Sequence, residues 1–529
     1  MSGELPLVEA SREGKLDRVN ALLAGGVEVD RPDGEGTTAL YAASVGGRTD
    51  VVRALLAAGA DPDRPSLGDS DGLPLCGAAC WGHEETVAAL LEAGADVDKA
   101  EDRGWTALKW AASGGHTGTV VRLLEAGADP NREVRTPPLY LAASRGAVGI
   151  VRLLLRHGAD PVGAAEGRGD GETALEAALR WTGVDIEGEL RAQKKEAYAE
   201  PGYEVVVTRR EEDDGTELIT ALAGREGEFG VTGSELQTGH GAIATLLERV
   251  LDIPTPIEEL VARAMEFRYL RPTAAEARRH VTERPAWEET VRTLAERDDE
   301  ESLREVLDLA EHPDPLYRTL GVDVLARLGP HLRTLPRLRR MARLENDPIL
   351  LRSLVRALSD HGDAAALPEL LRHARHPDER VRNAVARALV KVLPPEQPMD
   401  AGELIRLTGD EHEYVRDWAT MSLSLMDADT AELRDALARR MDDPSPVVVA
   451  EAVRGLAERG DRRAVTGIRH LLTDPTLENY PLDVTLEAVV RLGDPLLRRD
   501  VLACRPLAES HGLHDEWQEA LRSTSGGRI

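Results

Sequence analysis

The sequence has few cysteines, few aromatic residues and no long apolar run. Three cysteines, Cys76, Cys80 and Cys504, occur in 529 residues, so we expect no disulfide framework and a reducing, cytoplasmic location. No segment approaches the roughly 20 apolar residues of a membrane-spanning helix. The first residues have neither a basic nor an apolar stretch, so we expect no secretory signal. These absences favour a cytoplasmic protein that does not bind membranes.

Positive charge is also scarce relative to negative charge. The chain has 94 Asp and Glu against 65 Lys and Arg, which gives a formal net charge of −29. This charge repels phosphate backbones and anionic lipids, so we expect neither nucleic acid nor membrane as a partner. Only six of the basic residues are lysines, a bias typical of a GC-rich genome, and we expect a bacterial source.

Repeated phrases dominate the first third of the sequence. Gly-Ala-Asp occurs four times, at Gly59–Asp61, Gly94–Asp96, Gly127–Asp129 and Gly158–Asp160, with steps of 35, 33 and 31 residues. Between these phrases lie an alanine-rich helix, a glycine turn and a second helix with paired leucines. The leucines form an apolar face at helical spacing, and the glycine supplies the left-handed conformation that ends a helix. Such a period predicts stacked helical hairpins without one central core.

These phrases resemble the ankyrin repeat. Thr38-Ala-Leu and Thr106-Ala-Leu precede paired alanines, and Gly-His recurs at His83 and His116. The resemblance covers roughly residues 1–182, with an N-terminal capping repeat at Val8–Asp30. It implies one hairpin and two antiparallel helices per repeat, and partners bound by the hairpin tips and first helices.

The sixth of these repeats is interrupted. Its first helix starts at Thr173, but the Gly-His and Leu-Leu phrases of its second helix occur only at Gly239–Glu248. We therefore predict an insertion at about residues 184–236. Two β-prone runs around Asp214-Gly215 predict a β-hairpin within it. The insertion is either a functional loop on the binding face or a tolerated loop without function, and the sequence leaves both open.

A second repeat begins after residue 273. Asp-Pro or Pro-Asp turns recur about every 30–34 residues, and an apolar–arginine pair opens the helix behind four of them, at Arg318, Arg352, Arg382 and Arg416. Proline and aspartate both suit the first turn of a helix. The pattern resembles the short bacterial form of the HEAT repeat over about residues 275–500. The resemblance implies that these arginines pair with acidic residues of adjacent repeats.

Together the two arrays predict an all-α tandem solenoid, ankyrin repeats followed by HEAT repeats, with a possible small β-hairpin insertion. The predicted divisions are an ankyrin domain, a helical junction, a HEAT domain and a disordered tail, at residues 1–251, 252–274, 275–522 and 523–529.

Signatures of catalysis and metal binding are weak. Cys76, Cys80 and His83 are spaced like metal ligands, but we interpret them as small buried thiols and a histidine that bonds to the backbone near its turn. No phosphate-binding loop and no nucleophile elbow occurs. Asp417-Trp418 is similar to the Asp and Trp that HEAT-like alkylpurine DNA glycosylases use, although this chain is strongly acidic. We expect no catalytic residue, no cofactor and no metal.

Aromatic residues give the best candidates for partner contact. The chain has two Phe, eight Tyr and seven Trp. Tyr41, Trp81, Trp110 and Tyr140 occupy positions that face the concave side in ankyrin proteins, and aromatic anchors dominate interface hot spots. The sequence therefore predicts a non-catalytic protein-binding scaffold or adaptor that uses the ankyrin concave face and the HEAT groove. Its acidic field favours a partner with a basic surface.

Two alternatives stay open. A HEAT-fold enzyme or enzyme accessory, of lyase or DNA glycosylase type, requires a cluster of buried ionisable residues in one pocket of residues 275–500. A regulatory module would instead use residues 184–236 to cover the ankyrin groove and inhibit itself.

Overall fold

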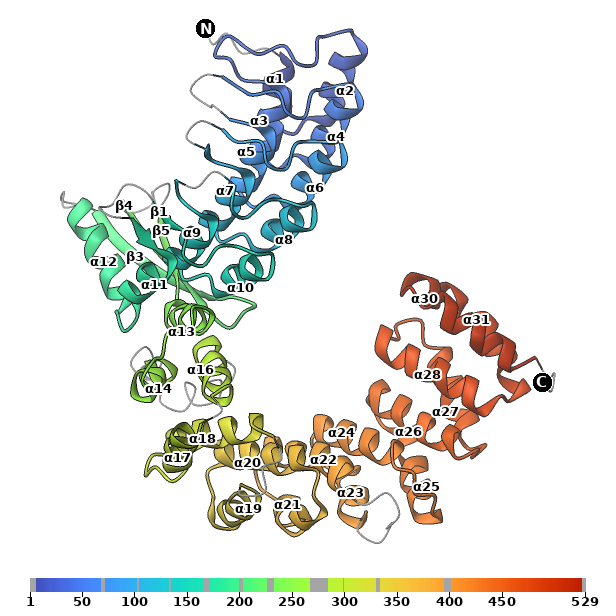
Figure 1. Ribbon diagram of the computed structural model, residues 1–529. Coiled ribbons are helices and arrows are strands. Elements are labelled where there is room, and N and C mark those ends of the chain that lie inside the picture. Colours follow the sequence, from blue (N-terminus) through green and yellow to red (C-terminus); the bar gives the residue numbers. More distant parts are fainter. Residues whose placement is uncertain are drawn as a thin grey trace. The chain divides into compact units, whose positions relative to one another are not determined.

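The chain forms two compact units, Met1–Thr293 and Leu294–Ile529, both built mostly of helices (Figure 1). The computed structural model describes residues 6–67, 72–101, 104–132, 135–165, 171–198, 203–225, 233–266, 284–297, 299–329, 334–393 and 401–525. The prediction of an all-α repeat protein with a small β insertion is confirmed. The predicted junction at 252–274 lies inside the first unit, and its residues 267–274 fall outside the described ranges.

The first unit stacks helical pairs in two adjacent rows (Figure 1). The row of first helices comprises α1 (Pro6–Arg12), α3 (Ala39–Val45), α5 (Pro74–Cys80), α7 (Ala107–Gly114), α9 (Pro138–Arg145) and α11 (Ala174–Trp181). The row of second helices comprises α2 (Leu16–Ala24), α4 (Thr49–Ala57), α6 (Glu84–Glu92), α8 (Thr117–Glu125), α10 (Val148–Arg156) and α13 (His240–Val250).

Local sequence explains where these first helices begin. The hydroxyls of Thr38 and Thr106 accept hydrogen bonds from backbone N–H groups three residues later. Thr173 forms a capping box with Glu176. Pro74 and Pro138 occupy the first turn of α5 and α9, where a missing N–H costs nothing. The predicted phrases therefore start helices as expected.

The Gly-Ala-Asp phrases end one repeat and connect it to its neighbour. Their glycines have φ of 92°, 88°, 90° and 83°, in the left-handed region. The backbone N–H of each following aspartate donates to a carboxylate or amide oxygen of the preceding hairpin. These pairs are Asp61 with Asp30, Asp96 with Asp63, Asp129 with Asp98, and Asp160 with Asn131.

The sixth repeat contains the predicted insertion between α11 and α13. The insertion forms helix α12 (Ile186–Ala197) and an antiparallel sheet of order β3-β4-β5. Strands β3 (Tyr203–Glu211) and β4 (Glu217–Arg225) pair directly through a turn at Gly215, so the β-hairpin prediction is confirmed. Strand β5 (Gly233–Gln237) and α12 were not predicted. Before α11, the short strands β1 (Ala164–Ala165) and β2 (Glu172–Thr173) pair antiparallel. After α13 come the helices α14 (Ile257–Met265) and α16 (Pro285–Ala295).

The second unit is a curved stack of helical pairs. Figure 1 shows one row on the inner side of its curve: α18 (Pro315–Arg327), α20 (Pro348–His361), α22 (Glu379–Val392), α24 (Glu413–Ser424), α26 (Pro446–Glu458) and α28 (Asn479–Leu492). The remaining helices are α17 (Glu300–Leu309), α19 (Leu335–Leu344), α21 (Leu367–His373), α23 (Gly402–Leu407), α25 (Ala431–Arg439), α27 (Ala464–Leu472), α29 (Arg498–Ala503), α30 (Arg505–Ser510) and α31 (His514–Ser523). The predicted tail begins at Ser523, which is the last residue of α31 and therefore helical. Residues 526–529 of the tail lie outside the described ranges.

A ladder of ion pairs links successive repeats of the second unit. Arg382 donates from Nε and Nη2 to the two carboxylate oxygens of Asp410, at 2.8 and 2.9 Å. Arg416 contacts Asp443 in the same way at 2.9 and 3.0 Å. Arg318 donates to Glu345 at 2.8 Å. The predicted pairing of these three arginines between repeats is confirmed. Their role is therefore to hold one repeat against the next.

Candidate functional site

The four predicted contact residues lie on first helices or directly after one. Tyr41, Trp110 and Tyr140 lie on α3, α7 and α9, and Trp81 directly follows α5. Trp81 exposes 63% of its surface, whereas the other three rings are partly buried. The structure thus places them on four successive repeats. Their role in binding a partner stays a prediction.

Carboxylates of the hairpins hold two of these rings in place. Glu101 accepts a hydrogen bond from Trp110 Nε1 at 2.8 Å and another from the backbone N–H of Leu73 at 2.7 Å. The hydroxyl of Tyr140 donates to Glu172 at 2.7 Å. These hydrogen bonds fix the orientations of the two rings.

Of the Cys76, Cys80 and His83 cluster, Cys76 is buried as predicted, whereas Cys80 is only partly buried. Cys76 is 1% exposed, and burial together with Glu101 raises the pKa of its thiol well above the usual value. His83 Nε2 lies 3.0 Å from the carbonyl oxygen of Val45, which confirms the predicted contact with the backbone. In the described ranges, no group of three or more His, Cys, Asp or Glu is placed to hold a metal ion.

This histidine contact recurs along the array and identifies the interrupted repeat. His116 contacts the carbonyl of Cys80 at 3.0 Å, and His240 contacts that of Ser144 at 3.2 Å. His240 thus makes the contact that we expect where Gly239-His240 resumes the sixth repeat. In the fifth repeat, Ala147 occupies the histidine position, and Arg145 donates to the equivalent carbonyl, that of Ser113, at 3.4 Å.

The same Arg145 also attaches the insertion to the array. Its Nη2 donates to Glu235 of β5 at 2.8 Å. In the turn between β3 and β4, Asp214 accepts a hydrogen bond from the backbone N–H of Gly149 at 3.1 Å, in the first turn of α10. Figure 1 shows the insertion beside α9 and α11, whereas Trp81 and Trp110 belong to earlier repeats. The insertion is thus joined to the turn between α9 and α10.

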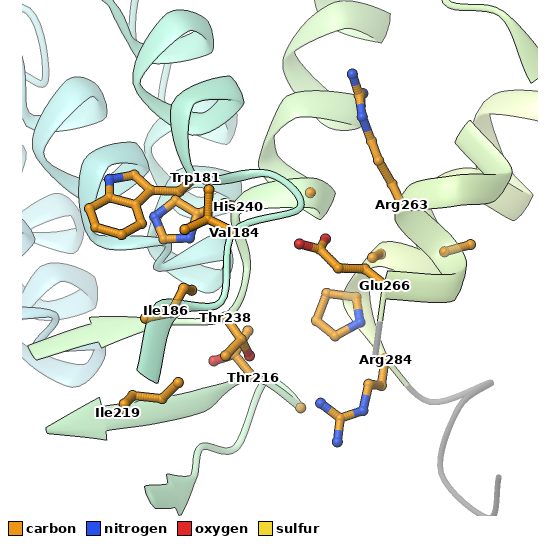
Figure 2. Close-up of a pocket in the computed structure, with 15 residues that line it drawn as sticks. Trp181, Val184, Ile186, Thr216, Ile219, Thr238, His240, Arg263, Glu266 and Arg284 are labelled. Carbon is orange, nitrogen blue, oxygen red and sulfur yellow. The ribbon is translucent and has the colours of Figure 1, made fainter. Parts of the chain in front are cut away.

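A small pocket lies between the insertion, the sixth repeat and α14. Figure 2 shows Trp181 and His240 on one side of it and Glu266 and Arg284 on the other. Burial lowers the pKa of His240 to about 4, so the ring is neutral, and burial raises the pKa of Glu266. Glu266 accepts from the backbone N–H of Gly183 at 2.6 Å. The interior volume of the pocket, about 40 Å³, has room for a few water molecules. We therefore interpret the pocket as a gap in the packing between these elements.

A second cluster of ionisable residues lies on the inner row of the second unit. Glu451 of α26 is fully buried and accepts hydrogen bonds from the Tyr480 hydroxyl at 2.6 Å, Ser424 Oγ at 3.2 Å and Arg454 at 2.5 Å. Burial raises the pKa of Glu451, and burial and Glu451 together raise the pKa of Tyr480. Tyr480 lies on α28, so three successive inner helices, α24, α26 and α28, meet at this carboxylate.

Asp417 lies on α24 next to this cluster. Burial, Glu451 and Glu413 raise its pKa to about 6. Sequence reasoning singled out Asp417 and Trp418 but missed Glu451 and Tyr480, which lie on later repeats and share no motif with them. Comparing inner-face positions between repeats could have found Glu451, because it lies eight residues after Asp443, as Trp418 does after Asp410.

Models of known protein families match both arrays. Ankyrin repeats match at residues 2–66, 66–134 and 136–164, and HEAT repeats match at residues 344–424 and 401–479. The chain therefore contains ankyrin repeats at residues 2–164 and HEAT repeats at residues 344–479, as the sequence resemblances implied. Both are domains typical of protein-binding scaffolds.

Curated relatives match only part of the chain. Protein YibA of Escherichia coli (strain K12) is 32% identical over 94 residues, which are 18% of this chain and 32% of YibA. Protein YibA of Escherichia coli O157:H7 matches with the same values. The chain thus spans about a third of the length of these relatives. Within the described ranges, no helix has both the length and the apolar character needed to cross a membrane.

Proposed function

We propose that this chain is a non-catalytic scaffold of the cytoplasm that binds a partner protein through the first helices of its ankyrin repeats. The observation that carries the proposal is the series Tyr41, Trp81, Trp110 and Tyr140 on four successive repeats. Exposed or partly exposed aromatic rings on rigid elements are the usual anchors of protein interfaces. The fixed rings of Trp110 and Tyr140 support this use of the face.

The experiment compares three full-length proteins as baits in extracts of the source organism, with captured proteins quantified by mass spectrometry. The test variant carries alanine at Tyr41, Trp81, Trp110 and Tyr140. The matched control carries alanine at four exposed residues of the second helices, two basic and two acidic, so that the net charge stays unchanged: Arg53, Glu92, Glu125 and Arg156.

At least one protein that the parent and the control capture should be lost from the test variant, by tenfold or more. Circular dichroism checks that the test variant keeps its helices. Because Trp81 is the most exposed of the four rings, Trp81→Ala alone should leave the fold intact and still weaken capture. Equal capture by parent, control and test variant would contradict the proposal.

One observation favours the enzyme alternative. Glu451 is buried, the pKa of Asp417 is raised to about 6, and perturbed pKa values often mark active sites. A glycosylase-like activity would release an alkylated base from duplex DNA, and Asp417→Asn would abolish the release. Incubating the purified chain with alkylated DNA tests this alternative. We expect no release, because the acidic groups around Asp417 disfavour DNA binding.

A further inference from the structure

The inner row of HEAT helices carries a surface on which carboxylates and aromatic rings are combined. We define the inner-face patch as Tyr414 and Asp417 on α24, Glu451 on α26, and Tyr480 and Asp483 on α28. Tyr414 and Tyr480 are 64% and 46% exposed, although both are large rings. The Tyr480 hydroxyl is bonded to Glu451, which links the exposed ring to the buried carboxylate.

Glu451 pairs with Arg454, but the two aspartates of this patch have no such partner among the described residues. Asp410 and Asp443, which are buried or partly buried, each pair with an arginine of the ladder. Asp417 and Asp483 have no lysine or arginine within 4.0 Å in the described part of the chain. Burial and neighbouring acidic residues raise the pKa of both, Glu451 and Glu413 for Asp417, and Glu516 and Glu487 for Asp483. Asp417 and Asp483 therefore carry negative charge that no basic side chain of the described ranges pairs with directly.

A guanidinium of the chain already stacks on an aromatic ring beside this patch. The guanidinium carbon of Arg387, on α22, lies 4.2 Å from the centroid of the Trp418 ring on α24. This is a cation–π contact between adjacent inner helices, one residue from Asp417. Arg387 is exposed, lies on the helix before the patch and covers Trp418, which is not part of the patch. Tyr414 and Tyr480 are the exposed rings of the patch.

We propose that the inner-face patch docks a segment of a partner protein that presents an arginine side chain, with the guanidinium against Asp417 and stacked on Tyr480. A guanidinium satisfies both features, because it binds carboxylates through paired N–H groups and stacks on aromatic faces. This inference rests on the proposed scaffold function and names the partner's chemistry at its second surface. Nucleic acid fits poorly, since its phosphates would approach uncompensated carboxylates.

The test uses a fluorescein-labelled peptide with three arginines separated by Gly-Ser, and a peptide in which citrulline replaces each arginine. Citrulline keeps the shape and removes the charge. Fluorescence anisotropy with the full-length chain at about 0.15 M salt should give at least tenfold tighter binding of the arginine peptide. The double variant Asp417→Asn, Asp483→Asn should bind the arginine peptide at least fivefold more weakly than the parent.

A matched control separates this site from the general charge of the protein. Asp308 on α17 and Glu432 on α25 are exposed carboxylates outside the inner row, and Asp308→Asn with Glu432→Gln removes the same charge. The control should bind the arginine peptide as the parent does. Equal binding of the arginine and citrulline peptides, or equal weakening in test and control variants, would overturn the proposal.

Two further arms keep this inference distinct from the ankyrin proposal. The variant with four alanines in the ankyrin face should keep parental affinity for the arginine peptide, and a loss there would show that the peptide binds elsewhere. A labelled single-stranded oligonucleotide should not bind. If the oligonucleotide binds the parent and not the double variant, the occupant of the patch is nucleic acid and not an arginine segment. If the ankyrin variant binds the peptide as the parent does and also captures every protein that the parent captures, the ankyrin proposal alone is refuted.

Discussion

At the scale of single residues, the surroundings of Asp417 disfavour the ionised form of its side chain. Its ordinary pKa is 3.8 and its pKa in the fold is about 6, so the folded state holds the proton more tightly than the unfolded state. The contribution to stability is therefore most favourable below about pH 4 and is lost as the pH rises through 6.

Replacing this carboxylate should stabilise the HEAT unit at neutral pH. After allowing for solvent screening, Asp417→Asn should raise the free energy of unfolding by about 1–2 kcal/mol at pH 7.5 and change it little at pH 4. Denaturant unfolding of parent and variant at the two pH values measures this difference. A variant no more stable than the parent at pH 7.5 would show that Asp417 carries no such strain.

Replacing an arginine of the ladder should instead lower the free energy of unfolding. Arg382→Ala leaves Asp410, whose side chain is 5% exposed, without its cation, and should cost about 3–5 kcal/mol of unfolding free energy. Arg382→Lys should not restore the loss, because lysine cannot make the paired contact. Arg380→Ala on the same helix is the control and should cost less than about 1 kcal/mol, since that arginine is exposed. Similar losses at both positions would contradict the ladder's role.

At the scale of elements, the insertion should be held to the array by Arg145. Arg145→Ala removes the contacts with Ser113 and Glu235 together. We expect amide hydrogen exchange in β5 and at the start of α10 to become about five- to tenfold faster, corresponding to about 1–1.4 kcal/mol. Arg156→Ala, at an exposed position of α10, should leave these rates unchanged. Unchanged exchange in the Arg145 variant would show that other contacts hold the insertion.

Elements with strong local signals could be predicted from the sequence, and those formed by tertiary contacts could not. The β3–β4 hairpin has a turn at Gly215, and α13 starts with the repeat's own Gly-His phrase. Helix α12 is highly charged and buries only Ile186, Leu190 and Lys194, so its apolar stripe is narrow. Strand β5 is short and polar and exists because β4 pairs with it.

The candidate sites follow the same division. Tyr41, Trp110 and Tyr140 lie within the recurring first-helix phrases and Trp81 lies directly after one, so the sequence alone places them. The hydrogen bond between Tyr480 and Glu451 joins residues 29 positions apart, in neighbouring repeats. No local spacing encodes that contact, since it depends on how the inner helices stack.

At the scale of the whole molecule, the two repeat arrays expose different chemistry. The ankyrin first helices offer aromatic rings that hairpin carboxylates hold, and the HEAT inner row offers uncompensated carboxylates beside exposed tyrosines. Because repeats contact only their neighbours, substitutions in one unit should leave the stability of the other unchanged. The variants of each unit can therefore be interpreted separately.

The most direct test of the scaffold account is hydrogen–deuterium exchange of the full-length chain with and without a protein that it captures. The account predicts slower exchange in α3, α5, α7 and α9, around the four aromatic residues, and unchanged exchange in α4, α6 and α8. Protection confined to the second helices, or none in the ankyrin unit, would contradict the claim that its first helices bind the partner.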